Sequence, residues 1–307
     1  MTTTPSQTQR SSPSQAQERL PGNTAGGVGE SPLRPDGILK VTGEFAYSSD
    51  MWLEDMLWGY TLRSPHPFAL IKSIDLTDAL ATAGVFAVLT HDDVPGEKFF
   101  GLEYADQPVL AKDLVRYEGE AVALVAADHP EIARKAAKKI KIEYEVLAPV
   151  TDAEVAIGHK PWTPPADAVD AGIDGDVPQL HPNGNLVRHL KLRKGDQGAT
   201  TDVVVSGVYD VGMQDQAFLG PESGLAVPDG EGGVDLYVAT QWLHVDQRQV
   251  CAALGLPPER VRLTLAGVGG AFGGREDLSM HVHGCMLALH TGKPVKMVYN
   301  RLESFYG

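Results

Sequence analysis

The chain has 307 residues but only two cysteines, Cys251 and Cys285. An iron–sulfur cluster or a zinc ribbon that is held by four thiolates needs more, so the sequence excludes both kinds of site. The two thiols could form one disulfide, but such sparse use of cysteine is typical of a reducing compartment. We therefore expect a cytoplasmic protein.

Long apolar runs and an excess of basic residues are also missing. No run of about 18 apolar residues is present, so we expect no transmembrane helix. There are 26 basic and 40 acidic residues, a formal net charge of −14, which argues against nucleic acid or an anionic membrane as the main partner. With 43% hydrophobic and 21% charged residues, the composition is that of a globular protein with one large domain or two ordinary ones.

Familiar catalytic and metal-binding signatures are lacking as well. The chain contains neither H-E-x-x-H nor the G-x-S-x-G nucleophile elbow. On one helix, His283 and His290 would be separated by a rise of about 10.5 Å, which is too far to share an ion. His281 and Cys285 would share a helix face but offer only two ligands. The sequence therefore predicts no metal site in this histidine-rich stretch.

Composition divides the chain into four parts. Residues 1–33 are rich in Ser, Thr, Gln, Pro and Gly, which predicts a disordered tail, and they lack the apolar core of a secretory signal. Residues 34–150 and 185–307 read as two folded domains, and the proline-punctuated residues 151–184 as a linker with little regular structure. No polar tail or cap follows the last residues, so we expect the front part of a longer protein.

Hydrophobic patterns predict the elements of the first domain. Apolar runs and period-two alternation indicate strands at 58–62, 69–76, 85–90, 121–126 and 140–146. A helix is predicted over 131–138, with Asp128 as its cap and Pro130 in the first turn. Together these elements predict a compact α/β domain.

The second domain is also predicted to mix helices and strands. Strands are expected at 202–209, 234–240, 261–265 and 296–299. A helix over 245–254 should end at Gly255, and a later helix carries one apolar stripe through Leu278, Val282, Cys285 and Leu289.

The 33 glycines cluster most densely at residues 267–276, between a predicted strand and a predicted helix. Glycines there permit positive φ and a close approach of a ligand to the backbone, and the following helix start would attract an anion. The spacing is no dinucleotide fingerprint, because the third glycine position is Phe272, and no Gly-Lys-Ser/Thr makes it a P-loop. The alternatives are an anionic ligand against the loop, with Phe272 as an aromatic wall, or a tight connection that binds nothing.

Gln241, at the end of a predicted strand, could donate a hydrogen bond from its side-chain amide to an oxo group.

These motifs, in this order, resemble a known family. The resemblance is carried by residues 34–50, 117–125, 144–150 and 214–222, by Thr240-Gln241, and above all by Gly-Gly-Ala-Phe-Gly-Gly-Arg-Glu at 269–276. The chain resembles the molybdopterin-binding large subunit of the xanthine dehydrogenase/aldehyde oxidase family of molybdenum hydroxylases. The resemblance implies an α+β or mixed α/β fold. Residues 34–150 would form an α/β hammerhead domain, and residues 185–307 would begin a truncated molybdopterin cofactor-binding α+β domain.

The resemblance also implies site residues. Gln241 would hydrogen-bond an oxo ligand of molybdenum, and Phe272 would lie near the metal and near an aromatic substrate. Glu276 matches a position where purine-oxidising members bind the heterocycle. The loop beside the metal and the pterin would comprise Gly269, Gly270, Ala271, Phe272, Gly273 and Gly274.

The family's reaction is hydroxylation of a carbon next to nitrogen or oxygen, and Glu276 favours a purine such as xanthine over an aldehyde. The resemblance also implies that electrons leave by iron–sulfur clusters and flavin. Since two cysteines cannot hold a cluster that needs four thiolates, a 2Fe-2S subunit and an FAD-binding subunit are expected as partners in a hetero-oligomer. The family's catalytic glutamate lies near the far end of the full subunit, so we expect the 307-residue chain to be inactive alone. Three alternatives stay open, namely a non-catalytic assembly module that contacts a partner through residues 131–146, an aldehyde hydroxylase, and a nucleotide-binding protein.

Overall fold

The computed structural model describes residues 29, 33–102, 104–157, 190–196 and 198–307. Most of the predicted tail and most of the predicted linker lie outside these residues. The described start of the linker holds a short helix, α5 (Ala153–Ala156), where the sequence predicted little regular structure. The Asp152 side chain begins this helix by accepting hydrogen bonds from the backbone N–H groups of Glu154 and Val155.

A seven-stranded mixed sheet in the order β11-β10-β9-β12-β1-β7-β3 forms the centre of the molecule. The first half of the chain supplies β1 (Leu57–Arg63), β3 (Val85–Leu89) and β7 (Ala121–Ala127). The second half supplies β9 (Ser223–Pro228), β10 (Val234–Val238), β11 (Val261–Leu265) and β12 (Val295–Val298). The predicted mixed α/β fold is therefore confirmed.

The two halves meet inside this sheet, where β1 and β12 pair in parallel with Leu57 opposite Val295. The Lys296 ammonium group is buried and donates to the carbonyls of Ser49 at 2.6 Å and Met51 at 2.8 Å. The backbone of one half is thus bound by a side chain of the other. The domain limits at 150 and 185 stay a prediction.

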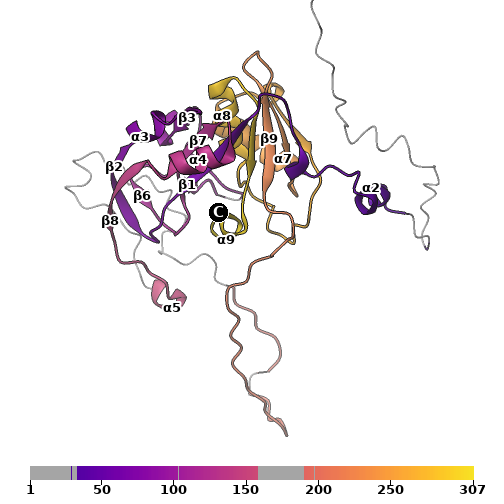
Figure 1. The fold of residues 1–307 in the computed structure, drawn as a ribbon. Helices are drawn as coiled ribbons and strands as arrows, with labels where there is room; N and C mark the ends of the chain where they lie inside the picture. The colour runs from indigo at the N-terminus through magenta and orange to yellow at the C-terminus, as the bar shows by residue number, and fades with distance from the viewer. Residues whose placement is uncertain (1–28, 30–32, 103, 158–189, 197) are drawn as a thin grey trace, which may run out of the picture.

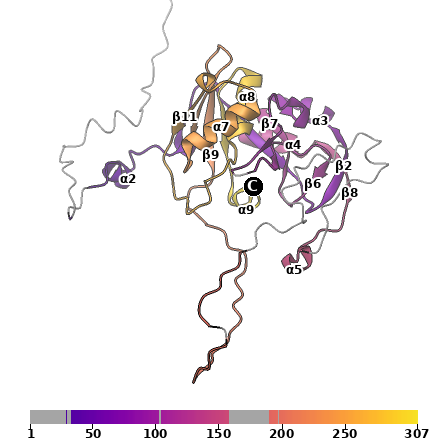
Figure 2. The ribbon, with the colours of Figure 1, turned by 180° about the vertical axis from the view of Figure 1, so that it is seen from behind.

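Helices cover both faces of the sheet (Figures 1 and 2). Helix α4 (Pro130–Ala137) packs on β1 and β7 from one side, while α7 (Leu243–Leu254) and α8 (His281–Thr291) lie on the other side. Strand β7 is buried on both faces, since Ala123 and Val125 face α4 whereas Leu124 and Ala126 belong to the core under α8. This double burial explains its unbroken apolar sequence.

Smaller elements complete the fold. A three-stranded sheet has the order β6-β2-β8, with β6 (Leu114–Val115), β2 (Ala69–Asp75) and β8 (Lys141–Val146), and a two-stranded ribbon joins β4 (Phe99–Phe100) to β5 (Gln107–Pro108). The short helices are α2 (Gly37–Thr42), η1 (Ser48–Asp50), α3 (Thr77–Leu80), η2 (His91–Asp93), η3 (Pro258–Arg260) and α9 (Arg301–Tyr306). Within the described ranges, no helix has the length and apolar character needed to cross a bilayer.

Two sequence predictions about these elements are wrong. Residues 202–209 form no strand, and their apolar side chains are largely exposed in a segment that runs away from the sheet (Figure 1). Valine-rich sequence favours a strand, but a strand needs a neighbour, and none pairs with this segment in the described part of the chain. The cap of α4 is His129 rather than Asp128, because Pro130 occupies the first helical position and the His129 ring accepts from the Glu131 N–H.

Candidate functional site

The glycine loop fills residues 266–280, between the end of β11 and the start of α8. Gly270 and Gly273 have φ of +108° and +86°, which is the left-handed region that favours glycine. At Gly269 a Cβ atom would lie 3.1 Å from the Cα of Gly220. The predicted positive φ is therefore confirmed at Gly270 and Gly273, whereas the backbone that approaches Gly269 is the protein's own, and the approach of a ligand stays a prediction.

Phe272 stands in the middle of this loop in a strained conformation. Its φ is +53°, which is uncommon for a residue other than glycine, and its side chain is 75% exposed. Strain of this kind costs about 1–3 kcal/mol and is concentrated at ligand sites. The exposed ring is free of the core packing that would be the simpler reason for an aromatic residue here.

Gln241 is attached to the loop by three hydrogen bonds. Its backbone N–H donates to the Arg275 carbonyl at 2.9 Å. Its side-chain oxygen Oε1 accepts from the backbone N–H of Gly273 at 3.1 Å and of Arg275 at 3.2 Å. The amide nitrogen Nε2, which can only donate, has no partner within the described ranges. The loop thus fixes one end of an exposed amide and leaves the other end able to bind an acceptor.

Arg275 carries a positive charge beneath this loop. Its side chain is 3% exposed, and its guanidinium lies 4.3 Å from the centre of the Phe218 ring. It also donates to the carbonyls of Gly220 and Ala239. Burial lowers the pKa of Arg275. The carboxylate of Glu222 acts against this shift, and the hydrogen bonds of the guanidinium go to carbonyls, so a desolvated cation lies in this part of the loop.

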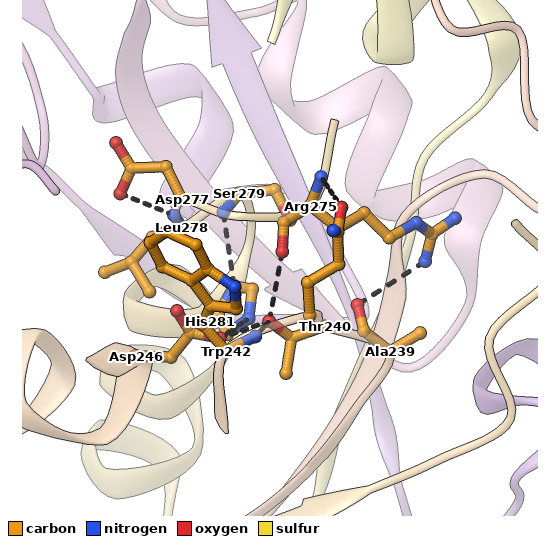
Figure 3. A network of polar contacts seen from close by, with 10 residues as sticks. Ala239, Thr240, Trp242, Asp246, Arg275, Asp277, Leu278, Ser279 and His281 are labelled. Atoms are coloured by element: carbon orange, nitrogen blue, oxygen red, sulfur yellow. Dashed lines mark hydrogen bonds and ion pairs between the residues drawn. The ribbon is translucent and has the colours of Figure 1, made fainter. Parts of the chain in front are cut away.

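A buried polar network supports the backbone on both sides of Gln241 (Figure 3). The Thr240 hydroxyl binds the Asp246 carboxylate, lies 3.2 Å from the Arg275 carbonyl and accepts from the Trp242 N–H at 3.3 Å. His281 Nε2 lies 3.7 Å from the same carboxylate. Burial raises the pKa of Asp246 to about 6 and lowers that of His281 to about 3. Sequence reasoning missed this network, and the available signal was an acid in the first turn of a predicted helix.

A polar hollow adjoins the loop on the side of Gly274. Glu222 is nearly buried there, and its Oε2 accepts from the Ser304 hydroxyl at 2.5 Å. Phe218 and Glu222 belong to the stretch 214–222 that carried part of the family resemblance. The lining of the hollow includes Gln107, Gln216, Phe218, Glu222, Gly274 and Asp277.

The structure gathers the predicted site residues into one place. Gln241 is bonded to the loop, and the Ala271 carbonyl accepts from the Gly274 N–H at 2.9 Å, which closes the turn around Phe272. The half-buried Glu276 follows this turn, and its Oε1 is 3.9 Å from the point where a Cβ of Gly273 would lie. Gln241, residues 269–274 and Glu276 thus form one surface.

One predicted feature of the site is wrong. The loop does not open directly onto a helix, because α8 begins only at His281, and the first residues of α8 are buried. The free N–H groups predicted to bind an anion at the helix start are therefore out of reach. The N–H groups of Gly273 and Arg275 are already used by Gln241.

His281 and His283 of α8 are buried, as are both cysteines, Cys251 in α7 and Cys285 in α8, whereas His290 at the end of α8 is exposed. His283 Nε2 contacts the Val109 carbonyl at 2.8 Å, and burial lowers the pKa of this ring to about 4. Cys251 and Cys285 are both buried free thiols, and burial raises the pKa of Cys285. Among the residues that the structure describes, no group of three or more His, Cys, Asp or Glu side chains could hold a metal ion.

Two family models match the chain. The aldehyde oxidase and xanthine dehydrogenase a/b hammerhead domain matches residues 42–148, and the molybdopterin cofactor-binding domain matches residues 180–307. The second match contains Gln241 and the whole glycine loop.

Curated relatives cover most of the chain. It is 37% identical over 275 residues to a probable xanthine dehydrogenase subunit of Bacillus subtilis, which covers 89% of this chain and 35% of that protein. It is 36% identical over 280 residues to the nicotinate dehydrogenase large molybdopterin subunit of Eubacterium barkeri. This match covers 90% of this chain and 62% of that protein. The chain thus spans about a third to two thirds of the length of these relatives.

Solved structures share the fold. The aldehyde oxidoreductase from Desulfovibrio gigas matches with a TM-score of 0.75 and 26% identity, covering 88% of this chain and 30% of that chain. Quinoline 2-oxidoreductase from Pseudomonas putida 86 matches with a TM-score of 0.75 and 29% identity, covering 90% and 35%.

Proposed function

Because the chain belongs to the xanthine dehydrogenase/aldehyde oxidase family, we propose that Gln241 and residues 269–274 hold the molybdenum cofactor of a hydroxylase. The observation that carries this proposal is the anchored amide of Gln241. Its Oε1 is bound by two N–H groups of the loop, so its Nε2 is left to donate to an oxygen ligand. The residues fit the group, since an oxo ligand only accepts hydrogen bonds and an amide nitrogen only donates them.

Each residue of the surface has a separate task in this proposal. The positive φ of Gly270 and Gly273 keeps the loop backbone open to close approach, and the exposed Phe272 ring offers a flat apolar wall. The buried Arg275 supplies positive potential under the loop for an anionic pterin. The cofactor, when bound, supplies two-electron oxidation at a carbon atom of the substrate.

We further propose that the substrate is a purine or a related nitrogen heterocycle. Glu276 is half-buried next to the loop, so its carboxylate can accept a hydrogen bond from a ring N–H while Phe272 stacks on the ring. Relatives whose names state such substrates support this class, including a probable xanthine dehydrogenase subunit and a nicotinate dehydrogenase subunit. An aldehyde is the second candidate, because the chain also resembles an aldehyde oxidoreductase.

The electrons must leave the site through other groups, and we propose that a 2Fe-2S subunit and an FAD subunit carry them. Cys251 and Cys285 are both buried in the core, and two thiols cannot supply the four ligands of a cluster. Several relatives are themselves named as subunits of dehydrogenases. The working enzyme would then be a hetero-oligomer.

Steady-state kinetics of the native complex tests the substrate class. We expect turnover of hypoxanthine or nicotinate, and we expect Glu276→Gln to lower kcat/KM for these heterocycles about ten- to hundredfold through loss of a charged hydrogen-bond acceptor. Glu259→Gln, at an exposed acid on η3, is the matched control and should keep the wild-type rate. Turnover of benzaldehyde alone, with no response to Glu276→Gln, would show an aldehyde hydroxylase instead.

A further inference from the structure

Asp246 is a carboxyl group in an unexpected place. It lies in the first turn of α7, it is 0% exposed, and no Lys or Arg side chain of the described residues is bonded to it. Burying such a group costs free energy unless its oxygens find partners. One oxygen, Oδ2, binds the Thr240 hydroxyl, whereas Oδ1 has no partner in the part of the chain that the structure describes. Because Asp246 is buried at a cost in free energy, we infer that its role lies in its polar contacts rather than in core packing.

His281 faces the same carboxyl from the start of α8. Its Nδ1 accepts from the Ser279 N–H at 3.1 Å, so the neutral ring carries its proton on Nε2. That nitrogen lies 3.7 Å from Asp246 Oδ2, which is beyond hydrogen-bond distance, and it has no hydrogen-bond partner in the described part of the chain. The carboxyl group is therefore enclosed between a hydroxyl from the Gln241 segment and an N–H from α8.

The Thr240 hydroxyl connects this acid to the proposed cofactor surface. It accepts from Trp242 N–H at 3.3 Å and lies 3.2 Å from the Arg275 carbonyl, so it contacts both the segment that contains Gln241 and the loop. The same Arg275 carbonyl accepts from the Gln241 N–H, and the Arg275 N–H donates back to Gln241 Oε1. Figure 3 shows Trp242, Asp246 and Arg275 around Thr240. The Thr240 hydroxyl thus contacts the backbone of both Trp242 and Arg275, and Arg275 in turn binds Gln241.

We propose that Asp246 is a positioning residue, which acts through the Thr240 hydroxyl to fix the 240–242 backbone against Arg275 and so to aim the Gln241 amide. The carboxyl touches neither cofactor nor substrate. The inference rests on the proposed function only for the statement that Gln241 serves the cofactor, because the contacts themselves belong to this chain.

Hydrogen exchange of the loop tests this proposal in the native complex. Thr240→Val keeps the side-chain shape but removes the hydroxyl, and Thr240→Ser keeps the hydroxyl. We expect amides in peptides covering 268–276 to exchange about tenfold faster in Thr240→Val, through loss of about one hydrogen bond, and at the wild-type rate in Thr240→Ser. In turnover, kcat should fall in Thr240→Val while KM stays unchanged, and Thr240→Ser should restore kcat.

The control is Glu120→Gln, which changes an equally buried acid in the other half of the chain. Its loop exchange and its kcat should equal those of the wild type. Asp246→Ala, which removes both oxygens that could accept from the Thr240 hydroxyl, gives a second variant in case Thr240→Val does not fold. Wild-type loop exchange in either folded variant would overturn the proposal. If the complex held no molybdenum, the proposed function would fail while the exchange result still decided the role of Asp246.

Discussion

At the scale of single residues, the conformation of the loop depends on where glycine stands. Gly270 has φ of +108°, and a Cβ there would lie 3.1 Å from the Phe218 Cβ and 3.2 Å from the Phe272 ring. We expect Gly270→Ala to lower the free energy of unfolding by about 1–3 kcal/mol, because an L side chain is strained at this φ. Denaturant unfolding of the purified chain measures this. Gly212→Ala is the control, since nothing lies within 4 Å of its Cβ position, and equal losses in both variants would contradict the account.

Asp246 makes stability depend on pH in a defined direction. Burial raises its pKa from 3.8 to about 6, so between these values the folded state holds a proton that the unfolded state has released. The contribution of Asp246 to the free energy of unfolding therefore falls as the pH rises from about 4 to 6. Above pH 6 this contribution of Asp246 no longer changes with pH. His281 works in the opposite direction, since burial lowers its pKa from 6.5 to about 3.

Asp246→Asn isolates this effect. We expect the stability of the variant relative to the wild type to rise between pH 4 and 6, because asparagine does not titrate, and to stay level above pH 6. Urea unfolding of both proteins across this range measures the difference. A difference that is independent of pH would show that the Asp246 carboxyl titrates normally in the folded state. Asp277 is the nearby acid that adds to the raised pKa.

At the scale of elements, the sequence predicted the helices and strands that depend on residues close together in the chain. Strand β7 followed from its apolar run, α4 from Pro130 near its start, and the end of α7 from Gly255, which has φ of +63°. The pairing of β1 with β12 was not predictable in this way, because it joins Leu57 to Val295 through tertiary contacts alone. The wrong prediction of a strand at residues 202–209 has the same reason. Val203–Val205 favour a strand only where a neighbouring strand is present to pair with them.

The β1–β12 junction gives a prediction about these elements. Lys296→Met removes the donor that serves the carbonyls of Ser49 and Met51, so we expect a loss of about 1–3 kcal/mol in the free energy of unfolding. Lys72→Met, at an exposed ion pair with Glu145, is the control and should change stability by about 0.5 kcal/mol or less. The two variants are compared by denaturant unfolding. Equal small effects would mean that the buried Lys296 contacts do not join the halves.

Site residues show the same division between local and tertiary causes. Gly270, Gly273 and Gln241 could be selected from the sequence, because a glycine cluster and a strand-end amide are local patterns. The bonds from Gln241 Oε1 to the loop and the enclosure of Asp246 could not, since they join residues about 30 positions apart. The resemblance predicted which residues form the proposed surface, and the structure added the polar network of Thr240, Asp246 and His281 beside it.

At the scale of the whole molecule, one seven-stranded sheet joins both matched domains and carries the proposed cofactor surface at its second-half end. The loop follows β11, which is an edge strand of this sheet, and Gln241 follows its neighbour β10. The rigid sheet therefore places the amide and the loop side by side. The whole chain has a formal net charge of −14, which argues against an extended acidic partner, and Arg275 is a buried cation of the proposed surface.

The molybdenum and pterin content of the native complex shows whether Gln241 and residues 269–274 hold the cofactor. We predict about one molybdenum and one pterin per copy of this chain, and a clear loss of both in Gly270→Val, where a branched side chain would fill the space beside Phe272. Metal analysis together with pterin fluorescence after oxidation gives both numbers. A folded wild-type complex that contains iron and flavin but no molybdenum, although molybdate was supplied, would contradict the account.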